Sequence, residues 1–176
     1  MPIHVDAYMA GGIARGVLAR AGSLREVLEH DRALTLERVQ WQPLGGRSGP
    51  SSGVSIPIDD VLVAVGDDDA GAPMHASWHA IRVEIGPYLI DGEMPTFPGF
   101  DPGRALTRPT GDFVLLRDVR IAPRDALDPQ AAGVPAGKQA LVNRYGVESV
   151  ACDLMLGFFF PGAEMIHADV AEADAS

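Results

Sequence analysis

Two histidines four residues apart, His75 and His79, come closest in type and spacing to a metal site. On a helix this spacing places both imidazoles on one face, as in many zinc sites. The residues after them alternate between polar and apolar, which indicates a strand, where the two histidines still share a face. A third ligand would come from His4, His167 or the aspartates at 67–69. Two interpretations stay open: a metal- or ligand-dependent β-barrel enzyme, or partly exposed histidines at the start of a strand.

Other residues that could do chemistry have simpler interpretations. Asp67, Asp68 and Asp69 offer the oxygens that hard cations bind, but the spacing of a calcium-binding loop is missing, so we predict a solvated linker. Cys152 lies in an alternating apolar segment and is predicted to be a small buried residue. Phosphate-binding loops, dinucleotide-binding fingerprints and nucleophile elbows are absent from the sequence. We therefore predict no catalytic residue and no cofactor, and an enzyme is the less favoured class.

An apolar segment near the carboxyl end, Leu-Met-Leu-Gly-Phe-Phe-Phe over 154–160, is the most suggestive functional feature. Successive side chains of a strand point to opposite faces, so three consecutive phenylalanines cannot all point inward. An exposed aromatic cluster is typical of an interface. The predicted interface residues are Leu154, Leu156, Phe158, Phe159 and Phe160. The alternative is a segment that crosses between two barrels and is buried on both sides. In either case it is a docking element, within the chain or between chains.

The charge of the chain limits its partners. The formal net charge is −10, and acidic residues outnumber basic ones in both halves of the sequence. A nucleic-acid surface needs a basic stripe to neutralise phosphates, so nucleic acid is an unlikely partner. An acidic Sm-like nucleic-acid binder would need a basic face made from five arginines. These are Arg108, Arg117, Arg120, Arg124 and Arg144.

Cysteine content and hydropathy indicate the compartment. The single cysteine cannot form an internal disulfide, which fits a reducing environment. The first residues lack the basic start and apolar run of a signal peptide, and no apolar run is long enough for a membrane helix. We expect a cytoplasmic protein without a membrane partner.

The elements that position these residues are organised around a repeated pattern. Residues 34–41, Leu-Thr-Leu-Glu-Arg-Val-Gln-Trp, return in similar form at 114–121 as Val-Leu-Leu-Arg-Asp-Val-Arg-Ile. In each copy two apolar residues two apart are followed by two polar residues and two more apolar ones. The interruption moves the buried set to the opposite face of the strand, so the strand must bulge or bend sharply. The repeat predicts an internal duplication with a strongly bent central strand in each copy.

The rest of the sequence completes two copies of one unit. In the first copy, strands are expected at 3–8 and 13–20, and Ser23 with Glu26 forms a capping box that opens a short helix over 23–30. A surface loop over 43–53 and a strand segment over 54–65 follow. In the second copy, strands are expected at 78–85, 88–94, 140–142 and 147–152, with a turn over 96–109 and a loop over 134–139.

These elements give a domain organisation in four parts. We expect one barrel repeat over 1–68, a second over 73–153, an apolar docking segment over 154–167 and an acidic disordered tail over 168–176.

Three short motifs in the first copy give a family resemblance. They are Gly-Val-Leu at 16–18, Leu-Thr-Leu-Glu-Arg-Val at 34–39 and Ile-Pro-Ile-Asp-Asp-Val-Leu-Val-Ala at 56–64. This order resembles the Sm-like family of small β-barrels, which carries a glycine in a bent second strand. The resemblance implies a mainly β fold, with two copies of a small, strongly bent barrel packed together.

The chain departs from that family at two points. The family's helix precedes the barrel, and its usual Arg-Gly is absent from 58–60, although Val-Asn-Arg at 142–144 is nearer. The family's RNA-binding residues are therefore not carried over. Another pair of SH3-like barrels or a duplicated β-sandwich fits the same strands. The leading functional hypothesis is a non-enzymatic cytoplasmic interaction or assembly module that binds a protein partner or itself through the apolar segment.

Overall fold

The chain folds mainly into β-strands, as the sequence predicts. In the computed structural model, the described residues are 1–68, 74–96, 111–152 and 159–167. The strands are β1 (His4–Met9), β2 (Gly12–Leu18), β3 (Ala33–Pro43), β4 (Gly49–Pro57), β5 (Val63–Gly66), β6 (Ser77–Ile85), β7 (Tyr88–Thr96), β8 (Phe113–Pro123), β9 (Val134–Asn143), β10 (Val147–Cys152) and β11 (Glu164–His167). The helical elements are α1 (Leu24–His30), the 3₁₀ turn η1 (Ile58–Asp60) and the single turn α3 (Pro129–Ala132).

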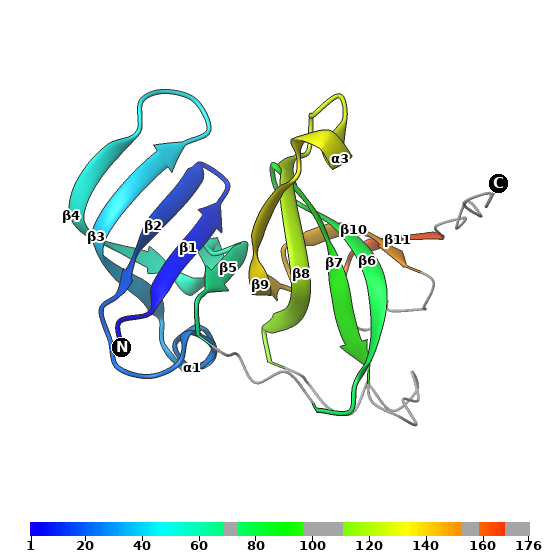
Figure 1. Cartoon of the computed structure of the whole chain (residues 1–176), viewed down its shortest axis with the longest axis horizontal. Coiled ribbons are helices and arrows are strands. Elements are labelled where there is room, and N and C mark those ends of the chain that lie inside the picture. The colour runs from blue at the N-terminus through cyan, green and yellow to red at the C-terminus, as the bar shows by residue number, and fades with distance from the viewer. Residues whose placement is uncertain (69–73, 97–110, 153–158, 168–176) are drawn as a thin grey trace.

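The described strands form one sheet of 11 strands in the order β11-β10-β6-β7-β8-β9-β5-β1-β2-β3-β4. The first half of the chain (residues 1–68) contributes β5-β1-β2-β3-β4, and the second half (from residue 74) contributes β10-β6-β7-β8-β9, flanked by β11. Figure 1 shows the two halves side by side, with β5 and β9 between them. This order is open: in the described part of the chain the pairings do not close either half into a barrel.

A bulge bends the central strand of each half. Gly16 of β2 lies where the register with β3 shifts, and Gly92 of β7 lies where the register with β8 shifts. Arg38 in β3 and Asp118 in β8 have φ values of 52° and 51°, a left-handed conformation that is uncommon outside glycine. An extra left-handed residue opposite one partner residue is the geometry of a bulge. The bulge that the sequence predicts is therefore confirmed in both strands.

The glycine opposite each bulge allows the two strands to approach closely. A Cβ atom on Gly16 would lie 2.8 Å from the Glu37 carbonyl oxygen, and one on Gly92 would lie 3.1 Å from the Arg117 carbonyl oxygen. Both distances are shorter than comfortable van der Waals contact. Each position therefore favours a residue without a side chain.

Helix α1 begins as the capping box predicts. The Ser23 hydroxyl oxygen accepts from the Glu26 amide at 3.2 Å, and the Glu26 carboxylate accepts from the Ser23 amide at 3.0 Å. Leu24, Val27 and Leu28 are buried on one side of the helix. The helix therefore covers one end of the core of the first half.

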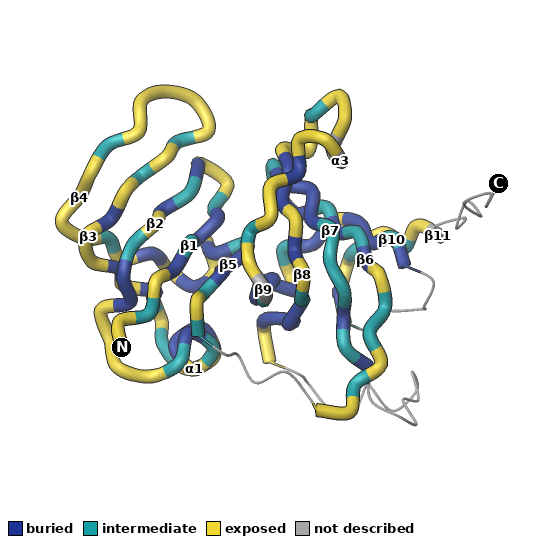
Figure 2. The backbone as a smooth tube through the Cα atoms, in the orientation of Figure 1, coloured by how far each residue is buried: buried dark blue, intermediate teal, exposed yellow. Residues whose placement is uncertain are grey.

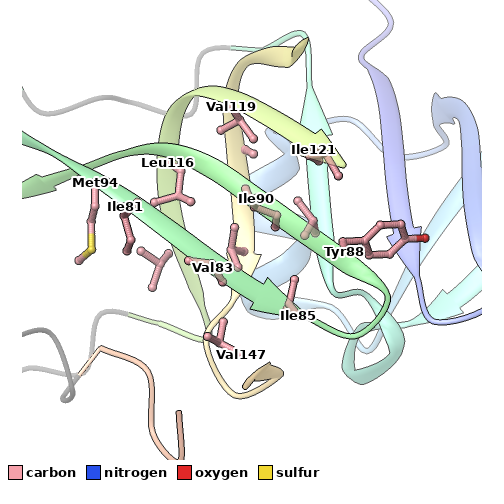
Figure 3. Packing of buried hydrophobic residues seen from close by; sticks show 14 of the residues in the cluster. Ile81, Val83, Ile85, Tyr88, Ile90, Met94, Leu116, Val119, Ile121 and Val147 are labelled. Atoms are coloured by element: carbon pink, nitrogen blue, oxygen red, sulfur yellow. The ribbon is translucent and has the colours of Figure 1, made fainter. Parts of the chain in front are cut away.

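Two apolar cores lie on either side of the strands that join the halves. β8 and β9 alternate between them, because successive side chains of a strand point to opposite faces. Phe113, Leu115 and Leu141 belong to the first-half core, whereas Val114, Leu116 and Val142 belong to the second-half core. Figure 3 shows part of the second-half core, with the labelled aliphatic side chains of β6, β7 and β8 facing one another. Each half thus completes the core of the other.

The structure corrects several element boundaries. Residues 49–53 belong to β4 and 134–139 belong to β9, although both were expected as loops. The expected strand segment over 54–65 is divided by η1 into the end of β4 and β5. Proline, glycine and serine made these segments resemble loops, but edges and bulges of sheets tolerate such residues. β11 and α3 were not predicted.

Three sequence predictions fall outside the described residues. They concern residues 97–109 of the turn expected over 96–109, residues 154–158 of the apolar segment, and the acidic tail over 168–176. Among the described residues, no helix combines the length and the apolar composition that crossing a membrane requires.

Candidate functional site

The two candidate metal-binding histidines lie in different settings. His75 is exposed in the turn before β6, whereas His79 is partly buried within β6. The His79 Nε2 atom lies 2.9 Å from the Thr96 hydroxyl on β7, and that hydroxyl donates to the Ser77 carbonyl oxygen at 3.4 Å. Within the described residues, no three His, Cys, Asp or Glu side chains are grouped so that they could hold a metal ion. The described structure brings no third ligand to this pair.

Two aspartates of the linker make structural contacts. The Asp67 carboxylate accepts from the His4 amide at 2.9 Å, and the Asp68 carboxylate accepts from the Leu24 amide at 2.9 Å. Asp68 therefore satisfies one of the unpaired amides in the first turn of α1. These bonds fasten the end of β5 to the start of β1 and to the helix. Asp69 lies outside the described residues.

Cys152 is buried in β10, as the sequence predicts. Its thiol donates to the Ala80 carbonyl oxygen of β6 at 3.3 Å. The side chain belongs to the second-half core. These contacts describe a packed core residue rather than an accessible nucleophile.

The described end of the apolar segment, Phe159 and Phe160, packs against the second half of the chain. Phe160 is fully buried in the second-half core, and Phe159 is partly buried against the same cluster. The other three predicted interface residues, Leu154, Leu156 and Phe158, lie outside the described residues. Whether the segment also contacts another chain stays a prediction.

The arginines proposed for a basic face are engaged with neighbours. Arg117 donates to the Glu93 carboxylate at 2.6 Å, and its guanidinium lies 3.9 Å above the ring of Trp78. Arg124 bridges Glu84 at 2.9 Å and Glu148 at 2.5 Å, and these contacts raise the pKa of its guanidinium. Cross-strand pairs of this kind hold strands in register and cancel local charge.

The remaining arginines of that set bind backbone atoms. Arg120 donates to the Gly133 carbonyl oxygen, and buried Arg144 donates to the Gly111 carbonyl oxygen at 3.1 Å. Arg108 lies outside the described residues. The four described arginines are therefore committed to carboxylates or carbonyls of the chain, which weakens the nucleic-acid alternative.

In the described sheet, the two halves are joined where β5 pairs with β9. The strands pair antiparallel, with Val63 opposite Val142, Ala64 opposite Leu141 and Val65 opposite Ala140; all six residues are buried. Strands from different halves thus bind through backbone hydrogen bonds with apolar side chains on both faces.

Two polar side chains reinforce the junction, and sequence reasoning assigned them no role. The buried side-chain amide of Asn143 donates to the Val61 carbonyl oxygen at 3.2 Å. The Tyr88 hydroxyl lies 2.8 Å from the Met9 carbonyl oxygen and 3.2 Å from that of Gly12, so it reaches the turn between β1 and β2. Figure 3 shows the Tyr88 ring extending from the second half towards the first. The local sequence signal for these contacts was a polar residue, Asn143, at the end of an otherwise apolar strand.

The far edge of the first half is exposed. β4 pairs only with β3 in the described sheet. Figure 2 shows β4 as mostly exposed, in contrast to β5 and the carboxyl end of β9, which are buried. Its sequence, Gly-Pro-Ser-Ser-Gly-Val-Ser-Ile-Pro, contains no charged residue. An open edge presents unpaired backbone donors and acceptors to another strand.

Comparisons with known proteins give no relative for this arrangement: no protein-family model, curated protein or solved structure matches the chain.

Proposed function

We propose that this chain is a non-enzymatic cytoplasmic interaction or assembly module that binds a protein partner or another copy of itself. The observation that carries the proposal is the β5–β9 junction, where two strand edges from different halves pair through three buried residues each. Association through sheet edges is a common mode of protein recognition. The exposed β4 leaves a second edge of the same sheet open to a partner. The chemistry of the described residues favours binding over catalysis.

We further propose that the halves are copies of one ancestral unit, with repeats over 1–68 and 73–153, each related to small Sm-like or SH3-like barrels. Three correspondences support this proposal. The strand orders agree, with β5-β1-β2-β3-β4 matching β10-β6-β7-β8-β9. The left-handed residues Arg38 and Asp118 are both central to a bulge. Gly16 and Gly92 face the same three kinds of atom across that bulge: a carbonyl oxygen, a Cβ and a valine methyl.

Sedimentation velocity of the full chain over a wide concentration range tests self-association. We expect the sedimentation coefficient to rise with concentration, and to rise more at higher salt, because salt screens the repulsion between copies of net charge −10. A monomer at every concentration and salt level would remove self-association and leave only binding to a different protein.

The predicted apolar interface needs its own variant. Phe158→Ser should shift self-association to higher concentration if Leu154, Leu156 and Phe158 contribute to a contact between chains. Leu127→Ser is the matched control, because Leu127 is fully exposed and the change in polarity is similar. Equal behaviour of the two variants would remove residue 158 from the interface.

A further inference from the structure

The last strands of the two halves, β5 and β10, can be matched residue by residue from the bulge glycines. Across β1, Gly16 is aligned with Gly66 of β5. Across β6, Gly92 is aligned with Cys152 of β10. The register with the neighbouring strand is unbroken over the three residues that precede each of these positions. Gly66 and Cys152 therefore hold equivalent places in their halves.

The three preceding residues of each strand pair with a further strand. On β5, residues 63–65 lie opposite residues 140–142 of β9. On β10, the equivalent residues 149–151 lie opposite residues 164–166 of β11. β11 therefore covers the same part of β10 that β9 covers on β5.

β11 is held less firmly than β9. Residues 140–142 of β9 are all buried, and the strand runs antiparallel to β5. In β11, Met165 is partly buried against the second-half core, whereas Glu164 and Ile166 are exposed. β11 also runs parallel to β10, and parallel pairing is slightly less stable per residue. The cover on β10 is therefore easier to displace than the cover on β5.

The strands β4 and β9 can be matched in the same way. Leu36 and Leu116 each lie two residues before the left-handed residue of their bulge. Their partners begin the matching segments, residues 54–56 of β4 and 140–142 of β9. In the described sheet β4 is an end strand with a free edge, at the opposite end from β11 (Figure 1). β4 therefore has the position of β9 but lacks the partner that β9 finds in β5.

Backbone directions agree with this match. The Ile58 amide donates to the Arg32 carbonyl oxygen at 3.1 Å, and bonded positions alternate along an antiparallel pair, so the Ser55 backbone groups point away from β3. The Asn143 amide donates to β5, so by the same alternation the Leu141 backbone groups point towards β5. Ser55 thus presents at the free edge of β4 the groups that Leu141 presents to β5.

We propose that β11 is a cap: it occupies the edge of β10 where β4 of a second copy of this chain would otherwise pair, and its release lets chains join head to tail. The pairing would repeat the β5–β9 junction, with residues 54–56 of one chain opposite residues 149–151 of the next. A contact between two different edges is heterologous, so each added chain leaves one edge of each kind free. The proposal rests on the proposed function, because it names the surfaces and the control of self-association.

The chemistry of the two segments allows this contact but keeps it weak. Residues 54–56 are Val-Ser-Ile and residues 149–151 are Ser-Val-Ala, so chains of net charge −10 can meet there without burying a charge. Ser55 stands in the place of buried Leu141 and adds less apolar contact. β11 belongs to the same chain as β10, so its effective concentration exceeds that of a dilute second copy. The capped state is therefore favoured in the native chain.

Two aspartate variants of β11 test the cap in the full chain. Met165→Asp places a charge against the second-half core and should detach β11, whereas Ile166→Asp adds the same charge at an exposed position. In sedimentation velocity, Met165→Asp should associate at lower protein concentration than the native chain and form species larger than a dimer. Ile166→Asp should behave like the native chain. Circular dichroism establishes folding, and Met165→Ser is the milder second variant if Met165→Asp does not fold.

A substitution in β4 identifies the partner strand. Ser55→Asp, combined with Met165→Asp, places a charge at the centre of the matched segment and should abolish the added association. Ser48→Asp, at an exposed position before β4, is the matched control and should leave that association unchanged. The chain with Ser55→Asp and Met165→Asp keeps a free β10 edge. Mixed with the native chain, whose β4 is free, it should form a one-to-one complex.

The outcomes separate this inference from the broader proposal. Added association in Met165→Asp that Ser55→Asp removes and Ser48→Asp keeps, together with the one-to-one complex, supports the cap. A folded Met165→Asp chain that associates no more than Ile166→Asp overturns the cap, and added association that Ser55→Asp leaves unchanged overturns β4 as the partner strand. In both cases concentration-dependent association of the native chain would leave the assembly module in place. If the native chain and Met165→Asp both stay monomeric, the cap and self-association are overturned, but binding to another protein is not.

Discussion

The fourth strands of the two halves, β4 and β9, occupy the same position in the strand order but have opposite surroundings. β9 lies between β8 and β5, and its residues 140–143 are buried. β4 lies beside β3 alone and is mostly exposed. Their sequences agree with these settings, because β9 ends in Gln-Ala-Leu-Val-Asn whereas β4 is rich in serine and glycine. One fold position can therefore serve as an internal joint in one half and as an open edge in the other.

The largest effect should come from a residue of the second half that packs in the first-half core. Phe113 is fully buried there, so Phe113→Ala should lower the free energy of unfolding by about 3–5 kcal/mol. The two tryptophans report each half separately: Trp41 packs against the first-half core, and Trp78 lies on β6. In single-tryptophan variants, urea unfolding should shift equally for both probes, because the halves share one sheet and each contributes residues to the core of the other.

The control for this prediction is Leu127→Ala, an exposed position at which little change is expected. A shift in the Trp41 transition alone would show that the halves unfold independently, and the comparison of two joined halves would lose its physical basis.

The two glycines opposite the bulges allow a direct comparison of the halves. Gly16→Ala and Gly92→Ala should each destabilise the chain, by about 1–3 kcal/mol as for other overpacked sites. Gly16→Ala should have the larger effect, because its Cβ would lie 2.8 Å from a carbonyl oxygen rather than 3.1 Å. Gly11→Ala is the control, since no atom lies within 4 Å of its added Cβ. Chemical denaturation measures all three, and a neutral result at either bulge would break the proposed equivalence.

Tyr88 should make the joint sensitive to alkaline pH. Burial, and to a lesser extent Tyr8, raises the pKa of Tyr88 from 10.0 to about 12. The unfolded chain therefore loses the tyrosine proton at a lower pH than the folded chain, and stability falls as pH rises from 10 to about 12. Tyr88→Phe should reduce this slope and also lower stability at neutral pH by about 1 kcal/mol through loss of a hydrogen bond.

Denaturation midpoints measured between pH 8 and pH 12 would check the Tyr88 prediction. Some slope should remain in Tyr88→Phe, because burial also raises the pKa of Tyr8. An unchanged slope would mean that Tyr88 ionises as easily in the folded chain as in the unfolded one.

The smallest effect concerns the helix of the first half. Ser23→Ala removes the acceptor of the Glu26 amide and should cost about 1 kcal/mol. Ser48→Ala, at an exposed position, is the control. Thermal unfolding followed by circular dichroism would measure both, and equal melting temperatures would show that the capping box contributes little to stability.

Local patterns in the sequence were sufficient for most strands, the capping box and the bulges. Alternation and the Ser23–Glu26 spacing act over a few residues, so they can be read without knowledge of the fold. The start of β9 was missed because Pro135 and Gly137 resemble a loop, although a register shift against β8 accommodates them. The start of β4 was missed for a similar reason, because Pro50 and the serines resemble a loop although they lie in an exposed edge strand.

Features that depend on distant residues could not be predicted from the sequence. No local pattern indicates that β5 pairs with β9, or that Tyr88 reaches the Met9 carbonyl oxygen across 79 positions. The parallel pairing of β11 with β10 and the burial of Phe160 in the core likewise have no local signal in the sequence. For the candidate site, the sequence identified the histidines and the phenylalanines as candidate residues but did not show how they are arranged in space. It could not show that Phe160 belongs to the core, because consecutive aromatic residues do not indicate which of them faces inward.

Hydrogen exchange at single amides tests the contrast between β4 and β9 most directly. The backbone amide of Asn143 donates to the Leu62 carbonyl oxygen at 2.9 Å and should be protected from exchange. The backbone amides of Gly53 and Ser55 point away from β3, so they should exchange rapidly in dilute solution. Strong protection of these two amides in dilute solution, equal to that of the Asn143 amide, would contradict the account.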